Sequence, residues 1–327
     1  MTTTSGQKRL SLRFHGRVLD HLGIQMYQSP VAAIAELISN SWDADAENVH
    51  VNLPTSLEPD SIIEIKDDGL GMTFEECQQK YLNVGWNRRG NNPAALSLKY
   101  HRPILGRKGI GKFAGFGIAD LIQIDTISEN TGERTIFQLD VNELRDGDYV
   151  AATEKEISVL EYLGPDNDRK REHGTKLTLK NLKMMRRPSP GQFTESMARR
   201  FLLHRYAQNF KVFINDVLLP EDDDNSHVEF SFPRAYEEEE KPQELIVDEE
   251  GWGSETLSNG KTIKWKIVFY REPIDHEELR GVAVYSRGKL SQTPFFFNLT
   301  GGLGGQHGQE YLSGQLEADY LDDTVQF

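Results

Sequence analysis

The sequence predicts an α/β protein built from two domains, residues 1–187 and 188–327, and three observations support this. Residues 29–46 show the apolar spacing of an amphipathic helix. Several short segments alternate apolar and polar residues, as half-buried strands do. After Met185 the character of the chain changes, beginning with the segment RRPSPG, which is typical of a linker.

The predicted helix at residues 29–46 has a start signal and two distinct faces. Ser29 is placed to cap it, and Pro30 suits its first turn. Because an α-helix turns about 100° per residue, Glu36, Asn40 and Asp43 fall within an arc of roughly 60°. The opposite side carries the apolar residues Val31, Ile34, Ile38 and Trp42. Taken alone, the polar stripe indicates an ordinary solvated helix face.

Strand-like alternation marks the rest of the first domain. The segments concerned are VHVNL, SIIEIKD, LIQIDTIS, TIFQLDV and TKLTLKNL. SIIEIKD ends at the turn DDGLG. Residues 82–105 are polar and irregular and lead into the glycine-rich GRKGIGKFAGFG, so we expect a mobile loop there.

The second domain combines predicted strands, one predicted helix and acidic loops. SMARRFLLHRYAQNF is expected to be a helix, and FKVFINDVLLP, TIKWKIVFYRE and GVAVYSRGKL to be strands. The acidic runs at residues 221–224 and 237–240 are most simply solvated loops. The tail stops without a domain-ending signal, which fits a piece of a longer protein.

Composition narrows the possible functions. The 327 residues carry a formal net charge of −14, which argues against a general affinity for nucleic-acid backbones. Cys77 is the single cysteine, which excludes an intrachain disulfide and a multi-cysteine zinc site. No apolar run approaches the length of about 18 residues that a membrane helix needs, and the N-terminus lacks a signal-peptide core. We therefore expect a cytoplasmic protein with no membrane partner.

Four motifs in order change the interpretation of the helix. ELISNSWDA at residues 36–44 is followed by DDGLGM at 67–72, by a glycine-rich run at 106–117, and by Gly174-Thr175. Each motif alone is common turn chemistry. Together they resemble the signatures of the GHKL ATPases, a group that includes Hsp90, MutL, type II topoisomerases and MORC proteins. The resemblance covers residues 15–185 well and the remainder loosely, and it is closest to MORC-like and Hsp90-like members.

This resemblance implies both a fold and an activity. The fold is a two-layer α/β sandwich, the Bergerat fold, in which helices cover one face of a mixed, mostly antiparallel sheet. A transducer-like (ribosomal S5-like) α/β domain follows it. The activity is Mg²⁺-dependent ATP binding and hydrolysis, in which residues 82–117 close as a lid and the chain forms an ATP-dependent homodimer clamp.

The resemblance also assigns roles to the stripe on the helix. Glu36 corresponds to the glutamate that orients or deprotonates the attacking water. Asn40, one turn later, would ligate Mg²⁺, which prefers oxygen donors. Asp43 corresponds to the next acidic position, which orients its neighbours, although a local hydrogen bond within the helix is an equally good interpretation.

A second group of residues would bind adenine. Asp67 would accept a hydrogen bond from the exocyclic amine, where guanine presents a carbonyl, although Asp before Gly also opens ordinary turns. Gly69 and Gly71 would let the backbone pass close to the base, and Met72 would line the apolar part of the pocket. Thr175 would support Asp67, the alternative being an ordinary strand threonine.

The glycine-rich run would let backbone amides approach phosphate oxygens, and it lacks the GK[ST] of a P-loop. Lys112 would add charge to this site, with a solvated lid lysine a nearly equal interpretation. Asn83, Arg88 and Arg89 are weaker candidates for phosphate contact. The residues of the run expected to contact the nucleotide are Gly106, Lys108, Gly109, Ile110, Gly111, Lys112 and Phe113.

The second domain should supply one further contact. FKVFINDVLL and GVAVYSRGKL resemble parts of a transducer domain, which presents a lysine to the γ-phosphate. Where MORC-like proteins carry that lysine, this chain has Ser291 and Gln292, so Lys289 is the nearest candidate and Arg287 the next. Considered by itself, Lys289 is more simply a surface hairpin lysine.

Three alternative functions compete with the ATPase. A sensor histidine kinase needs a phospho-acceptor hairpin upstream, and only 35 residues precede Glu36. A topoisomerase needs a cleavage domain, which is not visible. A nucleotide-sensing module with little or no turnover would keep Asp67 and Thr175 but would not need Glu36. A protein or nucleic-acid client would be bound through a C-terminal region beyond this sequence.

Overall fold

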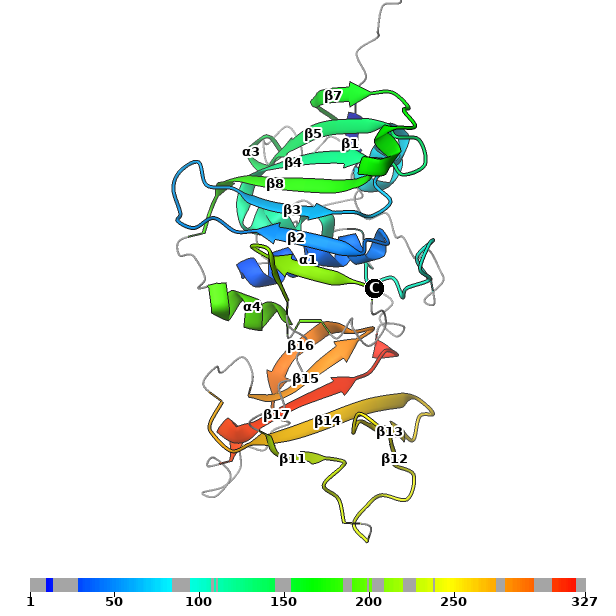
Figure 1. Ribbon diagram of the computed structural model, residues 1–327, viewed down its shortest axis with the longest axis vertical. Helices are drawn as coiled ribbons and strands as arrows, with labels where there is room; N and C mark the ends of the chain where they lie inside the picture. The colour runs from blue at the N-terminus through cyan, green and yellow to red at the C-terminus, as the bar shows by residue number, and fades with distance from the viewer. Residues whose placement is uncertain are drawn as a thin grey trace, which may run out of the picture. The chain divides into compact units, whose positions relative to one another are not determined.

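The computed structural model describes most of the chain, in two compact units (Figure 1). The first unit comprises Met1–Met197 and Ala207–Leu219, and the second comprises Ala198–Tyr206 and Pro220–Phe327. The described residues are 10–13, 29–83, 95–106, 109, 111–144, 154–184, 190–198, 200–201, 209–219, 228–237, 239–274, 280–296 and 308–321.

An eight-stranded sheet forms the frame of the first unit, in the order β10-β9-β2-β3-β8-β4-β5-β7. Neighbouring strands are antiparallel except for β2 and β9, which are parallel. The predicted mixed, mostly antiparallel sheet is therefore confirmed. The strands are β2 (Asn48–Asn52), β3 (Ile63–Asp67), β4 (Ala119–Ile127), β5 (Arg134–Asp140), β7 (Val159–Leu163), β8 (Gly174–Leu182), β9 (Lys211–Ile214) and β10 (Val217–Leu218).

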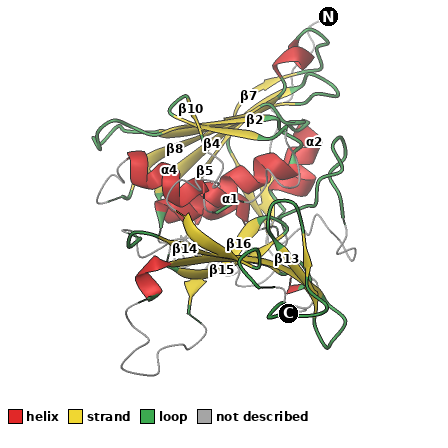
Figure 2. Cartoon of the chain, turned by 60° about the horizontal axis from the view of Figure 1, so that its bottom comes forward, coloured by secondary structure: helices red, strands yellow, loops and turns green. Residues whose placement is uncertain are grey.

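Helices cover one face of this sheet, as Figure 2 shows for α1. The central helix is α1 (Pro30–Asp43), and its apolar residues Ile34 and Ile38 are fully buried, as are Ile63 and Ile124 of the sheet. Apolar residues thus recur at the helical period in α1 and at every second position in the strands, which gives each layer one face to bury against the other. The remaining helical elements of the first unit are α2 (Phe74–Glu76), the π-helix η2 (Cys77–Tyr81), the 3₁₀ helices η3 (Gly111–Gly117) and η5 (Arg169–Glu172), α3 (Val141–Leu144) and α4 (Pro190–Ala198).

The ends of α1 follow the predicted signals closely. Ser29 occupies the N-cap position and Pro30 the first turn, although the Ser29 side chain makes no capping hydrogen bond. The helix stops at Asp43, three residues before the predicted end. Asp45 adopts a left-handed backbone conformation with φ of 59°, which a continuing helix cannot contain.

A small separate sheet joins the N-terminus to the first unit. It consists of β1 (Leu10–Arg13) and β6 (Glu154–Ile157), paired antiparallel. Leu10 and Leu12 are buried.

The described part of the second unit is a seven-stranded sheet with one 3₁₀ turn, η8 (Gln309–Tyr311). The path β12-β13-β14-β17-β15-β16 is joined by β11, which pairs with β14, and β15 and β17 are parallel. The strand predicted at residues 262–272 is confirmed over Thr262–Tyr270. The segment 281–290 is instead a hairpin, in which one strand ends at Ser286 and the next begins at Lys289. The strands are β11 (Val228–Phe232), β12 (Ile246–Val247), β13 (Gly253–Thr256), β14 (Thr262–Tyr270), β15 (Gly281–Ser286), β16 (Lys289–Phe295) and β17 (Leu312–Glu317).

The division of the chain differs from the single boundary predicted after residue 187. FKVFINDVLL, expected in the second domain, supplies β9 and β10 of the first sheet, where Val212 lies opposite Val49. Parallel pairing between strands so far apart in sequence leaves no local signal, so composition placed the segment with its neighbours. No helix among the described residues is both long and apolar enough to cross a bilayer.

Candidate functional site

The polar stripe of α1 is confirmed as a distinct face of the helix. Glu36 and Asn40 are half-buried, whereas every residue between them is buried. Within the described part of the chain, the Asn40 carboxamide makes no hydrogen bond, so its oxygen is available as an acceptor. A carboxylate and a carboxamide one turn apart therefore emerge side by side from a largely buried helix.

Glu36 lies directly against the glycine-rich run. A Cβ atom built on Gly111 would stand 2.9 Å from Glu36 Oε2. Any residue larger than glycine would therefore push the carboxylate aside. This contact brings the start of η3 next to the predicted general base.

Asp43 has a specific partner that the sequence did not reveal. Its Oδ1 accepts a hydrogen bond from the Leu105 N–H at 2.7 Å, and its Oδ2 accepts one from the Gly106 N–H at 2.8 Å. A Cβ on Gly106 would lie 2.6 Å from Asp43 Oδ2. Asp43 thus holds the loop that begins the glycine-rich run, which agrees with the orienting role and not with a hydrogen bond inside α1.

The carboxylate of Asp67 is buried and bound on three sides. Its Oδ1 accepts the N–H groups of Gly69 (3.0 Å) and Thr175 (3.1 Å), and its Oδ2 accepts the Ser41 hydroxyl (2.8 Å). Burial raises the pKa of this carboxyl above its ordinary value, although these three hydrogen bonds oppose the rise. Each carboxylate oxygen has two lone pairs, so one acceptor position remains on Oδ2.

A threonine pair joins Asp67 to the strand ends. The Thr126 hydroxyl accepts a hydrogen bond from the Met72 N–H at 3.0 Å and lies 3.1 Å from the Thr175 hydroxyl. Thr126 is fully buried. Thr175 therefore supports Asp67 through its backbone, while its side chain is held by Thr126. Thr126 and Ser41 carry no signal of this role beyond their places in LIQIDTIS and ELISNSWDA.

The DDGLG turn is built against the protein's own backbone. Asp68 accepts hydrogen bonds from the N–H groups of Glu47 (2.7 Å) and Asn48 (2.8 Å), which ties the turn to β2. Gly71 has φ of +59°, and a Cβ there would lie 1.8 Å from the Ile127 carbonyl oxygen. Gly71 is thus required by a protein contact, whereas the sequence predicted an approach to the base.

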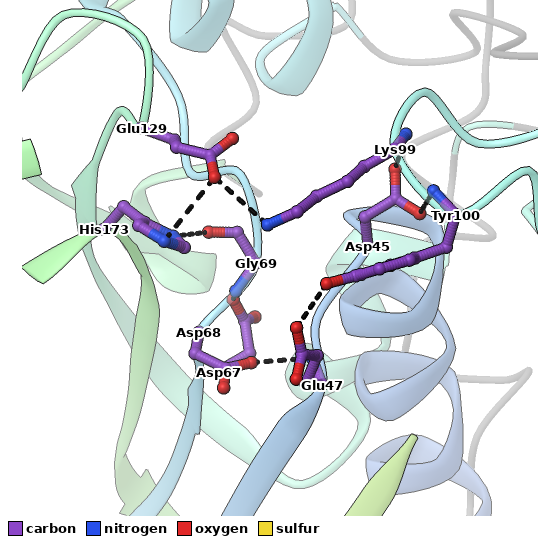
Figure 3. Close-up of polar contacts among 9 residues, drawn as sticks. All are labelled: Asp45, Glu47, Asp67, Asp68, Gly69, Lys99, Tyr100, Glu129 and His173. Atoms are coloured by element: carbon purple, nitrogen blue, oxygen red, sulfur yellow. Dashed lines mark hydrogen bonds and ion pairs between the residues drawn. The ribbon is translucent and has the colours of Figure 1, made fainter. Parts of the chain in front are cut away.

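A hairpin at residues 96–103 is fastened across this turn (Figure 3). The Asp45 carboxylate accepts the N–H groups of Lys99 (2.8 Å) and Tyr100 (3.2 Å). Lys99 Nζ lies 3.2 Å from Glu129 Oε1, and His173 Nε2 lies 3.7 Å from the same oxygen. His173 Nδ1 in turn lies 2.7 Å from the Gly69 carbonyl oxygen, so these contacts join the hairpin to the turn. Of these residues the sequence predicted only Gly69 individually, because the contacts of the others are long-range and leave no local pattern.

The glycine-rich run is mostly a packed 3₁₀ helix. Phe113 is buried, and a Cβ on Gly115 would meet Ile122 and Leu179 at 2.9 Å, so these two residues serve the core. Gly109 has φ of +64°. Lys108, Ile110, Arg88 and Arg89 lie outside the described residues.

Lys112 is not a solvated lid lysine. Its side chain is buried, and its ammonium donates hydrogen bonds to the Lys80 carbonyl (2.8 Å) and the Asn83 carbonyl (3.0 Å). This use of the ammonium differs from the phosphate contact predicted for it.

The lysine predicted in the second unit begins β16. Lys289 is half-buried and pairs with Ser286 across the hairpin, while Arg287 at the turn has φ of 53°. Its contact with phosphate stays a prediction. His, Cys, Asp and Glu side chains form no group of three that suits a metal ion anywhere in the described ranges.

Comparisons with known proteins show what this chain is similar to. The family described as "Histidine kinase-, DNA gyrase B-, and HSP90-like ATPase" matches residues 27–175, which contain α1, the DDGLG turn and Thr175. A Herpetosiphon aurantiacus protein named "Putative type II restriction enzyme HgiDII" is 27% identical over 320 residues, 95% of this chain and 49% of that protein. The "ATPase morc-1" of Caenorhabditis elegans is 45% identical over 48 residues, 15% of this chain and 6% of that protein. The chain thus spans at most about half the length of these two relatives.

Proposed function

Residues 27–175 belong to the histidine kinase-, DNA gyrase B- and HSP90-like ATPase family, and from this premise we propose that the chain binds ATP with Mg²⁺ and hydrolyses it. Family membership supports ATP binding directly. The match to a MORC ATPase supports a MORC-like form of this domain. We add three proposals to this. The chain hydrolyses ATP, hydrolysis is coupled to closure, and the residues named below perform it.

The Asp67 carboxylate carries the proposal. It is a buried group that only accepts hydrogen bonds when ionised, and the protein supplies three donors for its four lone pairs. The remaining position on Oδ2 suits the exocyclic amine of adenine, whereas the guanine carbonyl would meet it with repulsion. A buried carboxylate that keeps one acceptor position suits a ligand that brings its own donor, which is why Asp67 supports the proposal.

Glu36 is the proposed general base. The carboxylate lies against Gly111 at the start of η3, the glycine-rich run that we propose approaches the phosphates. There it would orient the attacking water and accept its proton. Asp43 acts one step away, because it holds the Leu105–Gly106 backbone that leads into the glycine-rich run.

The residues present also fit Mg²⁺. Asn40 offers a carboxamide oxygen on the same stripe as Glu36, and Mg²⁺ typically takes one or two protein oxygens and keeps waters and phosphate oxygens as its other ligands. When bound, the ion would neutralise developing charge on the phosphates.

The proposed cycle extends to closure and dimerisation. Residues 82–117 would close over ATP, Lys289 would meet the γ-phosphate, and two chains would form a clamp that hydrolysis reopens. Ultracentrifugation with a non-hydrolysable ATP analogue tests this part, with the expected result a doubled mass. A mass that stays monomeric would remove the clamp while leaving the ATPase intact.

Binding and phosphate release, each measured with Mg²⁺ and ATP, test the catalytic part. Glu36→Ala should bind ATP within about threefold of wild type but turn over at least ~100-fold more slowly, the usual contribution of a general base. Wild type itself should discriminate against GTP. Normal turnover in Glu36→Ala would remove Glu36 from its role, and ATP binding without turnover in wild type would favour a nucleotide-sensing module instead.

A second candidate function rests on the relative named as a restriction enzyme, which aligns with 95% of this chain. We propose that the ATPase serves a longer protein that acts on DNA. The net charge of −14 argues against a DNA track on this chain itself. ATPase rates with and without duplex DNA, for this chain and for a longer protein that contains it, test the idea: stimulation only in the longer protein supports it, and none in either contradicts it.

A further inference from the structure

The N-terminal strand β1 is held along both of its edges. One edge pairs with β6. On the other, the Gln78 carboxamide accepts a hydrogen bond from the Ser11 N–H (2.6 Å) and donates one to the Ser11 carbonyl (2.7 Å). One side chain thereby makes the pair of main-chain bonds that a neighbouring strand would make. Leu10 and Leu12, at 1% and 0% exposure, anchor the strand.

Gln78 belongs to the π-helix η2, a rare element that recurs at functional sites. Its characteristic hydrogen bond runs from the Leu82 N–H to the Cys77 carbonyl at 2.8 Å. The last carbonyls of a helix need partners from outside it, and a cation there complements the helix dipole.

Lys112 supplies that partner. Its ammonium donates to the carbonyls of Lys80 and Asn83, at 2.8 and 3.0 Å, and lies 5.8 Å from the centroid of the Tyr81 ring. A buried ammonium with such partners holds the backbone of its own segment in place. The residue before it is Gly111, whose hypothetical Cβ lies 2.9 Å from Glu36 Oε2.

We propose that Lys112 is a positioning residue that sets Gly111 against Glu36, and that the docked strand β1 controls its placement through Gln78 and η2. The chain of contacts runs from Ser11 to Gln78, along η2 to the Lys80 and Asn83 carbonyls, and through Lys112 to the turn beside Glu36. This inference rests on the proposed ATPase function. It gives the N-terminal strand a role in turnover without contact with the nucleotide.

We call the chain of contacts from Ser11 to Glu36 the relay. Two pairs of variants distinguish the loss of this relay from a general destabilisation of the fold. Gln78→Leu removes both main-chain bonds to Ser11 and a third to the Ser11 hydroxyl (2.9 Å). The control Gln79→Leu alters the adjacent exposed glutamine, whose side chain bonds Glu75 in the described structure. Lys112→Met removes the ammonium and keeps the aliphatic stem. Its control, Lys183→Met, removes a lysine that donates to the Phe116 carbonyl (2.6 Å) at the far end of the same 3₁₀ helix.

The expected signature is a fall in kcat without a change in ATP affinity. Lys112→Met should lower kcat by about 10- to 100-fold, since small misplacements in an active site have effects of that size. Lys112→Arg, which retains a cation and donors, should recover much of it. Gln78→Leu should lower kcat by roughly 3- to 10-fold, and the double variant should be no slower than Lys112→Met, because both changes break one chain of contacts.

Several outcomes would overturn the relay. A wild-type kcat in Lys112→Met would rule out the relay. An equal loss of kcat in the control Lys183→Met would rule it out as well. A loss of ATP affinity in Lys112→Met indicates a direct phosphate contact instead. If the two single losses of kcat multiply in the double variant, Gln78 and Lys112 act independently, and Gln78 does not belong to the relay.

Hydrogen exchange without nucleotide gives a readout independent of activity. Amides of residues 111–117 should exchange faster in Gln78→Leu than in Gln79→Leu. Equal amide exchange in Gln78→Leu and Gln79→Leu overturns the relay. This comparison does not use Lys112→Met, so it holds even if that variant does not fold. A wild-type chain without ATPase activity would contradict the proposed function, while this comparison would still decide the relay.

Discussion

At the scale of single residues, Asp67 is a compromise between stability and binding. Ionised, it is buried at a cost that only three hydrogen bonds offset, and burial raises its pKa above the ordinary 3.8. A raised native pKa means that the ionised form is disfavoured in the folded state. Its contribution to stability is therefore full below the unfolded value and is lost as the pH rises through the folded one.

Asp67→Asn should consequently separate the two properties. The carboxamide is uncharged and almost the same shape, so at pH 7 the Tm should hold or rise, at roughly 2–4 °C per kcal/mol gained. ATP affinity should fall by about 100-fold or more, because the amide nitrogen presents a donor to the adenine amine. Thermal melts and calorimetric titration measure the two effects. A lower Tm together with unchanged ATP affinity would contradict both assignments.

The same carboxyl should make ATP binding sensitive to acid. Protonation of Asp67 removes an acceptor, and because its pKa is raised, the loss should begin at a higher pH than for an ordinary aspartate. Titrations of Glu36→Ala with ATP between pH 4 and pH 7 should show a fall toward the acid end, beyond that of a control triphosphate whose purine lacks the 6-amino group. Identical pH profiles for the two nucleotides would contradict the role of Asp67.

Spacing predicted some of these residues and not others, for a physical reason. Glu36 and Asn40 share one helix face because α1 is regular, so the helical period sufficed. The partners of Asp67 come from positions 26 and 108 residues away, in Ser41 and Thr175. Both lie within motifs, but only Thr175 was predicted to support Asp67. Ser41 and Thr126 act through sheet register and helix placement, which local patterns do not encode.

At the scale of elements, Arg102 fixes the 96–103 hairpin. The side chain is 2% exposed, and its guanidinium lies 4.8 Å from the Trp42 ring centroid and 5.4 Å from that of Phe210. It donates to the Ala46 carbonyl (2.5 Å) and to Asn209 Oδ1 (2.9 Å). One buried cation therefore joins the hairpin, α1 and the segment that leads into β9.

Arg102→Met should destabilise the first unit by about 3 kcal/mol, since it leaves buried acceptors without donors and removes cation–π contacts. Arg102→Lys should recover only a small part, because an ammonium cannot make the same forked contacts. Denaturant midpoints measure both. If Arg102→Met lost no more stability than an exposed control such as Lys264→Met, the hydrogen bonds and ring contacts of Arg102 would contribute little.

At the scale of the whole molecule, the first sheet depends on a strand from beyond its expected domain. β9 covers the edge of β2, and β10 completes a hairpin on it. A change in composition predicted two domains, and alternation predicted most of their strands. The parallel pairing of Val49 with Val212 has no local trace, since it is created only when the sheet closes. The domain identity of the second unit stays a prediction.

A chain that ends at residue 187 should therefore be less stable than one that ends at residue 219. It would leave the β2 edge without its partner, and bare edges favour association between chains. We expect a lower urea midpoint and a larger aggregated fraction on size exclusion. Equal midpoints for the two chains would show that β9 adds nothing to the sheet.

The passage of the backbone out of the first unit and back has a consequence for inheritance. Because β9 and β10 return only after residues 198–206 have joined the other unit, neither unit is encoded by one uninterrupted stretch of gene. Recombination that moves a single segment would deliver an incomplete sheet to its new host. The two units should consequently be inherited together, because the chain passes between them more than once.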